Sequence, residues 1–472
     1  MVEQRVGELW RVDVLPALME YMAIPNVSPA YDPDWVAGGH MAAAVELVRG
    51  WCEARPIEGM TVRVQELEGR TPVVVCDIPA FGGGSTAGHE DTVLLYGHLD
   101  KQPPMEGWKE GLGPWTPVRR DEKLYGRGGA DDGYAAFASL SAIEALRAAR
   151  GRHARCILLI EASEESGSPD LPAHVDALAD TLGSPSLVVC LDSGCATYDQ
   201  MWATTSLRGL ASLNVRCEVL TQGVHSGGAG GVVPSSFRIL RALLARIEHA
   251  ETGDLLLPEL HAPLPDDRLA EARATAAELG LPAGGTFPFA EGVHGMNEGD
   301  PEAQLLARTW GPSLAYVGID GLPPTATAGN VLRASTTMKL SFRLPPNADA
   351  QRAVDAVGRA LTTDVPQGAK ITLDDIEVAD GWNAPPFAPW LVAALESAST
   401  NAYGRPARTI GEGGSIPFMG MLGARFPEAQ FLVTGVLGPG SNAHGPNEFL
   451  HVPYATALTG AVAHVLDAHS AR

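Results

Sequence analysis

The stretch DTVLLYGHLD, residues 91–100, sets the fold class of this chain. Its apolar run ends abruptly in polar residues, and the same is true of TPVVVCDIP (71–79), ARCILLIEASEE (154–165), PSLVVCLDSG (185–194) and AQFLVTGVLGPG (429–440). Continuous apolar runs separated by helix-like stretches such as 135–150 are typical of strands that are buried on both faces. We therefore predict an α/β domain with a mostly parallel sheet flanked by helices.

A second pattern begins near residue 207. LASLNVRCEVLT (210–221), ASTTMKLSFRLPP (334–346) and AKITLDDIEV (369–378) alternate between apolar and polar residues, which predicts half-buried strands. The stretches 235–250 and 349–364 predict amphipathic helices that pack against them. Since 472 residues exceed the ~250–300 at which one core stops growing, two domains are expected. We expect a smaller α+β domain at 207–382, inserted between 1–206 and 383–472 of the α/β domain.

Composition argues against several classes of partner. The net charge is -22, with 56 acidic against 34 basic residues, so the chain repels a phosphate backbone and we expect no nucleic acid partner. The sequence contains no uninterrupted run of ~18 apolar residues, so we expect no membrane span. Residues 1–22 lack the basic start and apolar core of a secretory signal. The six cysteines include no C-x-x-C pair, which favours reduced thiols and a cytoplasmic location.

Histidine and acidic side chains follow the predicted buried strands at the point where each strand ends. In an open α/β sheet the carboxyl ends of the strands converge on one crevice. Two imidazoles with several carboxylates suit a pair of divalent cations, and zinc, manganese and cobalt all fit such ligands. The residues concerned are His98, Asp100, Asp131, Glu164, Glu165, Asp192 and His444.

These residue types also suit hydrolysis. A carboxylate can bridge two cations ~3.5–4 Å apart, and the cations then activate a shared water. A separate carboxylate must take the proton of that water and pass it to the leaving amine. The adjacent pair Glu164 and Glu165 can divide these two tasks. Asp100 stands two residues after His98, where it can orient the imidazole from behind.

Each residue alone also has an ordinary explanation. A His-x-Asp sequence can form a turn, and Asp131 with Asp132 can cap a helix. Asp192, before Ser193 and Gly194, can be a turn residue, and His444 can lie in a surface loop. Their shared position at the ends of successive buried strands favours a metal site over independent surface roles.

Eight motifs together resemble a known family. In order along the chain they are YGHLD, LYGRGGADDG, EASEESGS, LDSG, GVHSGG, FRLPP, EGGSIP and SNAHGPNE. The chain resembles the zinc-dependent exopeptidases, in particular the branch of the cytosolic non-specific dipeptidases and carnosinases. It is more distantly similar to acetylornithine deacetylase and succinyl-diaminopimelate desuccinylase. The resemblance extends from about residue 90 to residue 450 and implies hydrolysis of dipeptides or short peptides that depends on two metal ions, zinc first among them.

The resemblance implies a role for each metal-site residue. Asp131 would bridge the two cations, His98 and Asp192 would complete one site, and Glu165 and His444 would complete the other. Glu164 would act as general base and acid. Asp100 would be the partner of His98.

Further roles fall on the remaining motifs. The resemblance implies that His225 stabilises the oxyanion in a neighbouring subunit's active site, and hence a homodimer formed through the inserted lid domain. Arg343 would bind the substrate's terminal carboxylate, assisted by Ser415. Glu412 would pair with a free substrate amine, and Asn330 would lie near the oxyanion or the carboxylate.

Three departures leave the substrate open. Relatives commonly read DDKG where this chain has Asp-Asp-Gly-Tyr at 131–134, and HSxNE where it has HGPNE. The region 379–387 also lacks the His-Gly-Gly found in some dipeptidases. An amidohydrolase acting on N-acyl or N-carbamoyl amino acids is therefore an alternative. A catalytically silent binding subunit is another alternative. It predicts the loss of a metal ligand or of the general base, and this sequence retains both.

Overall fold

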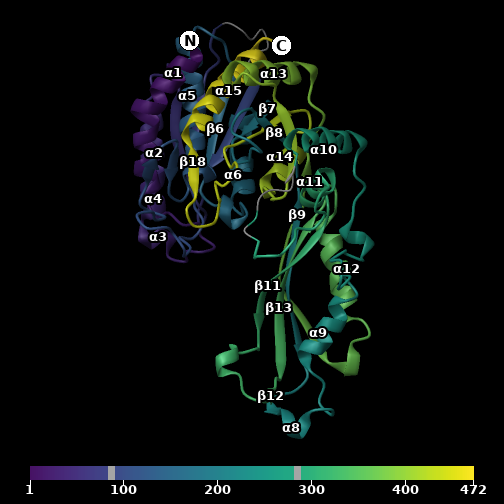
Figure 1. Ribbon diagram of the computed structural model, residues 1–472. Coiled ribbons are helices and arrows are strands. Elements are labelled where there is room, and N and C mark those ends of the chain that lie inside the picture. Colours follow the sequence, from purple (N-terminus) through teal and green to yellow (C-terminus); the bar gives the residue numbers. More distant parts are fainter. Residues whose placement is uncertain (83–90, 281–286, 288) are drawn as a thin grey trace. The chain divides into compact units, whose positions relative to one another are not determined.

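The computed structural model describes residues 1–82, 91–280, 287 and 289–472 (Figure 1). These residues form two compact units. Unit 1 comprises Met1–Thr205, Ala384–Ile410 and Met421–Arg472, and unit 2 comprises Ser206–Asn383 and Gly411–Gly420. No composition shift or periodicity change in the sequence sets the short segment Gly411–Gly420 apart from its neighbours. The lid and dimerisation roles predicted for the inserted part stay predictions.

A large mixed sheet forms the centre of unit 1. Among the described residues it has nine strands, of which eight follow one another across the sheet and β16 (Arg408–Glu412) pairs with β8. The order is β1 (Thr61–Gln65), β2 (Val73–Ile78), β6 (Arg155–Glu161), β3 (Thr92–His98), β7 (Pro185–Cys190), β17 (Gln430–Val433), β8 (Trp202–Leu207) and β15 (Trp382–Asn383). Strand β15 and the ends of β8 and β16 fall within the residues of unit 2.

The four central strands of this sheet pair in parallel. β3 lies between β6 and β7 and runs parallel to both, and β17 runs parallel to β7. These strands are the continuous apolar runs, and every residue of β3 is buried. The outer pairs are antiparallel, and the connection 66–72 between β1 and β2 is too short for the crossover that a parallel pair requires. The α/β class is confirmed, in the form of a mixed sheet.

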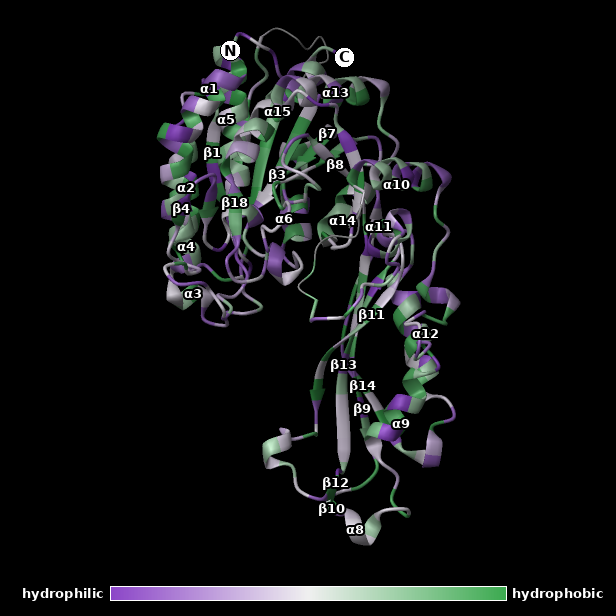
Figure 2. Ribbon diagram, viewed as in Figure 1, coloured by the Kyte–Doolittle hydropathy of each residue, from purple (hydrophilic) through white to green (hydrophobic). Residues whose placement is uncertain are grey.

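Helices cover this sheet. α5 packs against β3 and β6, and α4 packs against β1 and β2. α5 is buried around most of its circumference because α1 and α15 cover its outer side. Figure 2 shows the sheet strands of unit 1 largely in the hydrophobic colour. The helices are α1 (Val2–Leu9), α2 (Leu15–Met22), α3 (Trp35–Gly38), α4 (His40–Glu53), α5 (Tyr134–Ala148), α6 (Leu171–Ala177), α7 (Ala179–Leu182), α13 (Pro389–Tyr403), α14 (Pro417–Arg425, which contains a unit boundary) and α15 (Val452–Ser470).

A smaller antiparallel sheet accompanies it. Its strands are β18 (Phe449–His451), β5 (Lys123–Tyr125) and β4 (Val118–Arg120), in that order. β18 follows the loop that carries His444, and β5 precedes the turn Gly129–Gly133 that carries Asp131. Pairing of β18 with β5 therefore brings these two loops to the same part of unit 1.

Unit 2 is an α+β fold. A four-stranded antiparallel sheet has the order β11 (Ser313–Asp320), β13 (Ser335–Leu344), β9 (Gly209–Glu218) and β14 (Lys370–Ala379). Alternate residues of β9 and β13 face the core beneath α9 and α12, as the period-2 pattern predicted. The helices are α8 (Ser226–Ala229), α9 (Ser236–Leu244), α10 (Asp266–Leu279), α11 (Pro301–Thr309) and α12 (Ala350–Thr362), and β10 (Val224–His225) pairs with β12 (Val331–Leu332).

No helix within the described ranges is long and apolar enough to span a bilayer.

Candidate metal centre

The predicted ligands gather at one edge of the central strands of unit 1. His98 is the last residue of β3, and Asp192 follows the end of β7 by two residues. Glu164 and Glu165 stand just beyond β6, in a short helical turn. Because these three strands are parallel, their carboxyl ends meet at the same edge. The fold thus delivers to one place the side chains that the sequence pattern singled out.

Asp131 lies between two imidazoles. Its Oδ1 is 3.4 Å from His98 Nε2, and its Oδ2 is 3.0 Å from His444 Nε2. His444 Nε2 also lies 3.4 Å from Glu165 Oε2. Each oxygen of the Asp131 carboxylate therefore faces a different imidazole. This is the arrangement expected of a carboxylate that bridges two cations.

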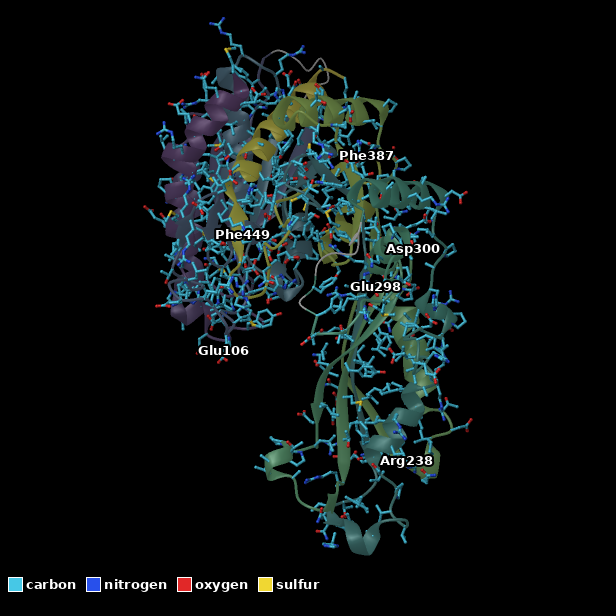
Figure 3. All side chains as sticks on the ribbon, in the orientation of Figure 1. Glu106, Arg238, Glu298, Asp300, Phe387 and Phe449 are labelled. Atoms are coloured by element: carbon cyan, nitrogen blue, oxygen red, sulfur yellow. The ribbon has the colours of Figure 1, made fainter. Side chains whose placement is uncertain are left out.

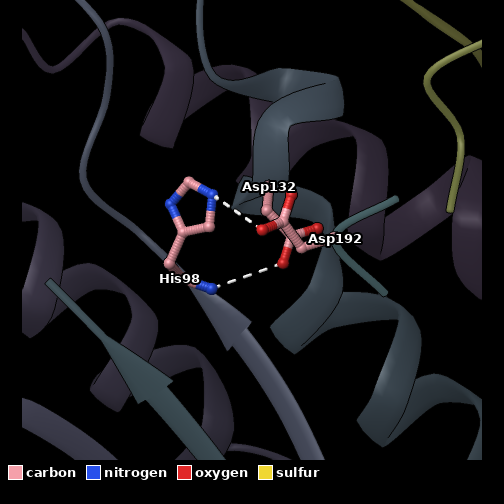
Figure 4. Close-up of side chains that lie close together, drawn as sticks. All are labelled: His98, Asp132 and Asp192. Atoms are coloured by element: carbon pink, nitrogen blue, oxygen red, sulfur yellow. Dashed lines mark hydrogen bonds and ion pairs between the residues drawn. The ribbon is translucent and has the colours of Figure 1, made fainter. Parts of the chain in front are cut away.

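His98 has acidic groups on several sides. Its Nε2 lies 3.8 Å from Asp192 Oδ2 and 4.0 Å from Glu164 Oε2. Figure 4 shows His98 with Asp192 and with Asp132, whose Oδ2 accepts a hydrogen bond of 3.3 Å from the His98 main-chain N–H. All four side chains are buried or nearly so. A cation at Nε2 would have carboxylate oxygens within reach.

Asp100 ties the β3 and β6 ends together. Its Oδ1 and Oδ2 accept hydrogen bonds of 3.0 Å each from the main-chain N–H groups of Glu164 and Glu165. His98 Nδ1 lies 3.1 Å from the Asp100 carbonyl oxygen and 3.5 Å from Asp100 Oδ1. Asp100 therefore orients the imidazole and also fixes the backbone of both glutamates. The second contact could not be seen in the sequence.

Asp132 was missed as a member of the cluster. The sequence analysis assigned it no role beyond a possible helix cap, yet Asp132, His98 and Asp192 offer ligand atoms within 4.8 Å of one another. A second such group joins His98 with Asp131 and Glu165. The available signal was its place directly after Asp131, in a turn that is wholly buried.

Carboxylates outnumber imidazoles in this cluster, and the acidic groups raise the pKa of both His98 and His444 against the effect of burial. Burial, followed by the Asp131 charge, raises the pKa of Glu165 to about 8. Burial and the Asp192 charge raise the pKa of Glu164 well above its usual range. Burial by itself would raise the pKa of Asp131 too, but hydrogen bonds to His444 and His98 hold it below its usual value. A divalent cation bound among such crowded carboxylates would stabilise their ionised form.

Unpaired polar atoms give a direct test of the fit to metal ions. Among the described residues, buried side-chain atoms without a hydrogen-bond partner include His98 Nε2 and Glu165 Oε1. An imidazole nitrogen and a carboxylate oxygen are ordinary ligands for zinc and similar cations. The donor set therefore fits a pair of divalent cations.

The missing lysine of the DDKG pattern has a steric reason. Gly133 occupies that position, and a Cβ atom there would lie 2.1 Å from the Tyr21 ring and 2.5 Å from the Gly128 carbonyl oxygen. The Tyr21 hydroxyl in turn donates to the Leu99 carbonyl oxygen at 2.6 Å, beside His98. In this chain a buried tyrosine fills the space that a side chain at position 133 would need.

The remaining predicted residues lie in unit 2 and form two groups. Arg343 NH1 donates to Ser415 Oγ at 3.0 Å, so these two residues lie together. Glu412 Oε2, predicted to meet a substrate amine, instead accepts from Arg308 at 3.2 Å. His225 is exposed on β10, and the carbonyl oxygen of Asn330 accepts a hydrogen bond of 2.9 Å from Ser226 next to it.

Arg208 was missed by sequence reasoning. Its main-chain N–H donates to Gly414 O at 3.1 Å, and its Nε donates to Gly413 O at 3.1 Å. Its NH1 donates to Ser313 Oγ at 3.3 Å, and Ser313 is the register partner of Arg343. Arg208 therefore holds the glycine turn that carries Ser415 beside Arg343. Arg208 lies in the stretch SLRGL, which matches none of the motifs of the family resemblance.

A comparison with protein families agrees with this geometry. Residues 94–468 match the profile of peptidase family M20/M25/M40, which is most of the chain. The chain belongs to this family. The predicted resemblance to the dipeptidase and carnosinase branch is confirmed, and this M20 chain is a metal-dependent peptidase.

Individual relatives of this M20 peptidase are dipeptidases by name. It is 27% identical over 414 residues to the "Cysteinylglycine-S-conjugate dipeptidase" of Corynebacterium striatum, covering 84% of this chain and 87% of that protein. It is 27% identical over 300 residues to the human "Beta-Ala-His dipeptidase", covering 61% of this chain and 56% of that protein. Its fold is similar to that of the di-peptidase Dug1p of Saccharomyces cerevisiae, with a TM-score of 0.78, 22% identity and coverage of 100% and 98% of the two chains.

Proposed function

We propose that this M20 peptidase hydrolyses the peptide bond of dipeptides and other short peptides with the help of two bound cations. The observation that carries the proposal is the position of Asp131, with one carboxylate oxygen facing His98 and the other facing His444. The dipeptidase names of its relatives support the choice of substrate.

The ligands would divide between two sites that share Asp131. His98 and Asp192 would complete one site, and Glu165 and His444 would complete the other. We propose zinc as the cation, with manganese and cobalt as alternatives, because imidazole and carboxylate ligands accept all three. When bound, the cations would polarise the scissile carbonyl and activate a water molecule.

Glu164 would carry the proton. It is nearly buried, its main-chain N–H is fixed by Asp100, and its Oε2 points toward His98 at 4.0 Å. We propose that Glu164 takes a proton from the attacking water and delivers it to the leaving amine.

Unit 2 would bind the ends of the substrate. Arg343 and Ser415, already joined by a hydrogen bond, would receive the terminal carboxylate. Asn330 would lie near the oxyanion or that carboxylate. Glu412 would receive a free amine, but its ion pair with Arg308 competes with that task. This ion pair favours a second candidate function, the hydrolysis of N-acyl or N-carbamoyl amino acids, which present no free amine.

Metal removal followed by a substrate panel tests both candidates. Complete chelation should reduce hydrolysis to background, and zinc, manganese or cobalt added separately should restore it. For a dipeptidase, free dipeptides should exceed their N-acetyl or N-carbamoyl counterparts at least tenfold in kcat/KM, since loss of a charged hydrogen bond costs about 1.5–3 kcal/mol.

A dipeptide with an amidated C-terminus tests the role of Arg343, because it lacks the terminal carboxylate. Its kcat/KM should also fall at least about tenfold relative to the free dipeptide. Faster turnover of N-acyl substrates than of free dipeptides would select the second candidate. Full activity after complete removal of metal would contradict both candidates.

A homodimer would form through unit 2. Strand β11 is an edge strand, and Tyr316, Val317 and Ile319 on it are exposed apolar side chains. A groove beside this strand is lined by Phe237 and other residues of α9, where Figure 3 labels Arg238. An exposed edge strand with apolar side chains is suited to pair with its own copy about a two-fold axis. We propose a second copy of this chain as the occupant of this surface.

His225 would then act in the partner's active site as an oxyanion donor. His225→Ala and Glu164→Gln should each lose at least about 100-fold in kcat. An equal mixture, exchanged between subunits, should recover about a quarter of the wild-type activity, since half of the dimers are hybrids with one complete site. Steady-state rates before and after subunit exchange provide the measurement, with sedimentation to verify the dimer. No recovery among verified hybrids would place His225 outside the partner's site.

We also infer a cytoplasmic location. The six cysteines, all within the described residues, are buried and form no disulfide, which agrees with a reducing compartment.

A further inference from the structure

His444 differs from the other proposed metal ligands in how it is held. It lies in the irregular segment between β17 and β18, with 57% of its side chain exposed, whereas His98 is fully buried at a strand end. Its backbone adopts a left-handed conformation with φ of 63°, which non-glycine residues rarely favour. Contacts made by the loop itself must therefore keep this imidazole in place.

Arg127 supplies one of those contacts. Its NH2 donates to the carbonyl oxygen of His444 at 2.9 Å, and its Nε donates to the Pro103 carbonyl oxygen at 3.3 Å. Its NH1 forms an ion pair with Glu448 Oε2. The guanidinium thus uses all three nitrogens to join segments that are far apart in sequence. Only 1% of the Arg127 side chain is exposed, so solvent does not compete for these bonds.

Glu448 extends the same connection to the turn that carries Asp131. Its Oε1 accepts a hydrogen bond of 2.9 Å from the Gly128 N–H, and its carbonyl oxygen accepts one of 3.1 Å from Gly126. Glu448 is fully buried and directly precedes Phe449, the first residue of β18, which Figure 3 labels. The pair therefore joins the backbone just before Asp131 to the backbone of His444.

We propose that the Arg127–Glu448 pair is a positioning device that sets the cation affinity of the site formed by Asp131, Glu165 and His444. Neither residue is proposed as a ligand. The pair acts by fixing the His444 carbonyl, and with it the direction of the imidazole toward Asp131 and Glu165. Residues that orient a ligand from behind typically contribute 10–100-fold to metal affinity. The inference rests on the two-cation function proposed above.

The effect should be confined to one of the two sites. His98 and Asp192 are held by buried strand ends, and the contacts of Arg127 and Glu448 described here do not include them. Weakening the pair should leave the His98 site loaded while the His444 site empties. A general loss of stability would instead affect both sites together.

Arg127→Lys provides the test, because lysine keeps the positive charge beside Glu448 but lacks the planar fork that reaches three acceptors. Affinities for zinc are measured by competition with a chromophoric chelator on purified protein, and bound metal is counted by elemental analysis. We expect two cations in the wild type, and in Arg127→Lys one unchanged affinity and one weakened about 10–100-fold. Glu448→Gln, which keeps an acceptor for Gly128, should show the same selective loss.

Arg155→Lys is the matched control. Arg155 forms a two-point ion pair with Asp77 in unit 1, between β6 and β2, and should not affect either affinity when replaced. Two unchanged affinities in Arg127→Lys would overturn the proposal. So would an equal loss of affinity at both sites in Arg127→Lys and Glu448→Gln. A wild type that binds fewer than two cations would instead overturn the two-cation function, so the two failures are distinguishable.

Discussion

The variant Glu164→Gln is expected to keep both cations and to lose between about 100- and 10,000-fold in kcat, the range attributed to a general acid–base group. Glutamine has nearly the same shape, but its amide cannot take a proton from water at neutral pH. The main-chain N–H of Glu164 is fixed by Asp100, so the substitution need not move the loop. Because the carboxylate acts on a proton and not on substrate binding, KM should change little.

The neighbouring glutamate gives the control for this prediction. Glu165 Oε2 lies 3.4 Å from His444 Nε2 and accepts a hydrogen bond of 2.6 Å from Gln102, which places it among the proposed ligands. Glu165→Gln should lose one cation, whereas Glu164→Gln should lose none. Metal content and steady-state kinetics of both proteins separate the two roles. A Glu164→Gln protein with wild-type kcat, or with less bound metal than the wild type, would remove Glu164 from its proposed task.

Much of the fold and the placement of the ligands could be predicted because both follow from local patterns. Apolar runs that end in His98, Glu165 or Asp192 predict buried parallel strands, and the topology of such sheets brings their ends together. The period-2 stretches predicted the half-buried strands β9 and β13 equally well. In both cases residues close in sequence carry the information.

Contacts between segments that are distant in sequence could not be predicted from the sequence. Nothing local shows that Arg208 holds the Gly413–Gly414 turn, or that Glu412 pairs with Arg308, because each contact joins segments about a hundred or more residues apart. The antiparallel pairing of β2 with β6 was not predicted either, since the apolar pattern of a buried strand is the same in a parallel and in an antiparallel pair. Asp132 was a different case, in which a helix cap and a member of the metal cluster share one sequence signature.

Asp131→Asn is expected to have the largest effect on metal binding. The two oxygens of this carboxylate face His98 and His444, so a single substitution changes both proposed sites at once. An amide offers one oxygen where the carboxylate offers two, and it brings no negative charge to offset two dications. Both affinities should fall by more than the roughly 10–100-fold that follows loss of an outer partner. Hydrolysis should drop to background at ordinary metal concentrations.

The adjacent Asp132 separates this explanation from a general effect of charge removal. Its Oδ2 accepts the His98 main-chain N–H, a bond that an asparagine oxygen can also accept. Asp132→Asn should therefore keep both cations, although an acidic side chain is replaced one residue away. Chelator competition on the two variants, with circular dichroism to verify folding, gives the comparison. If Asp132→Asn lost both cations while Asp131→Asn kept one, the bridging role would belong to Asp132, because only a shared ligand couples the two sites in this way.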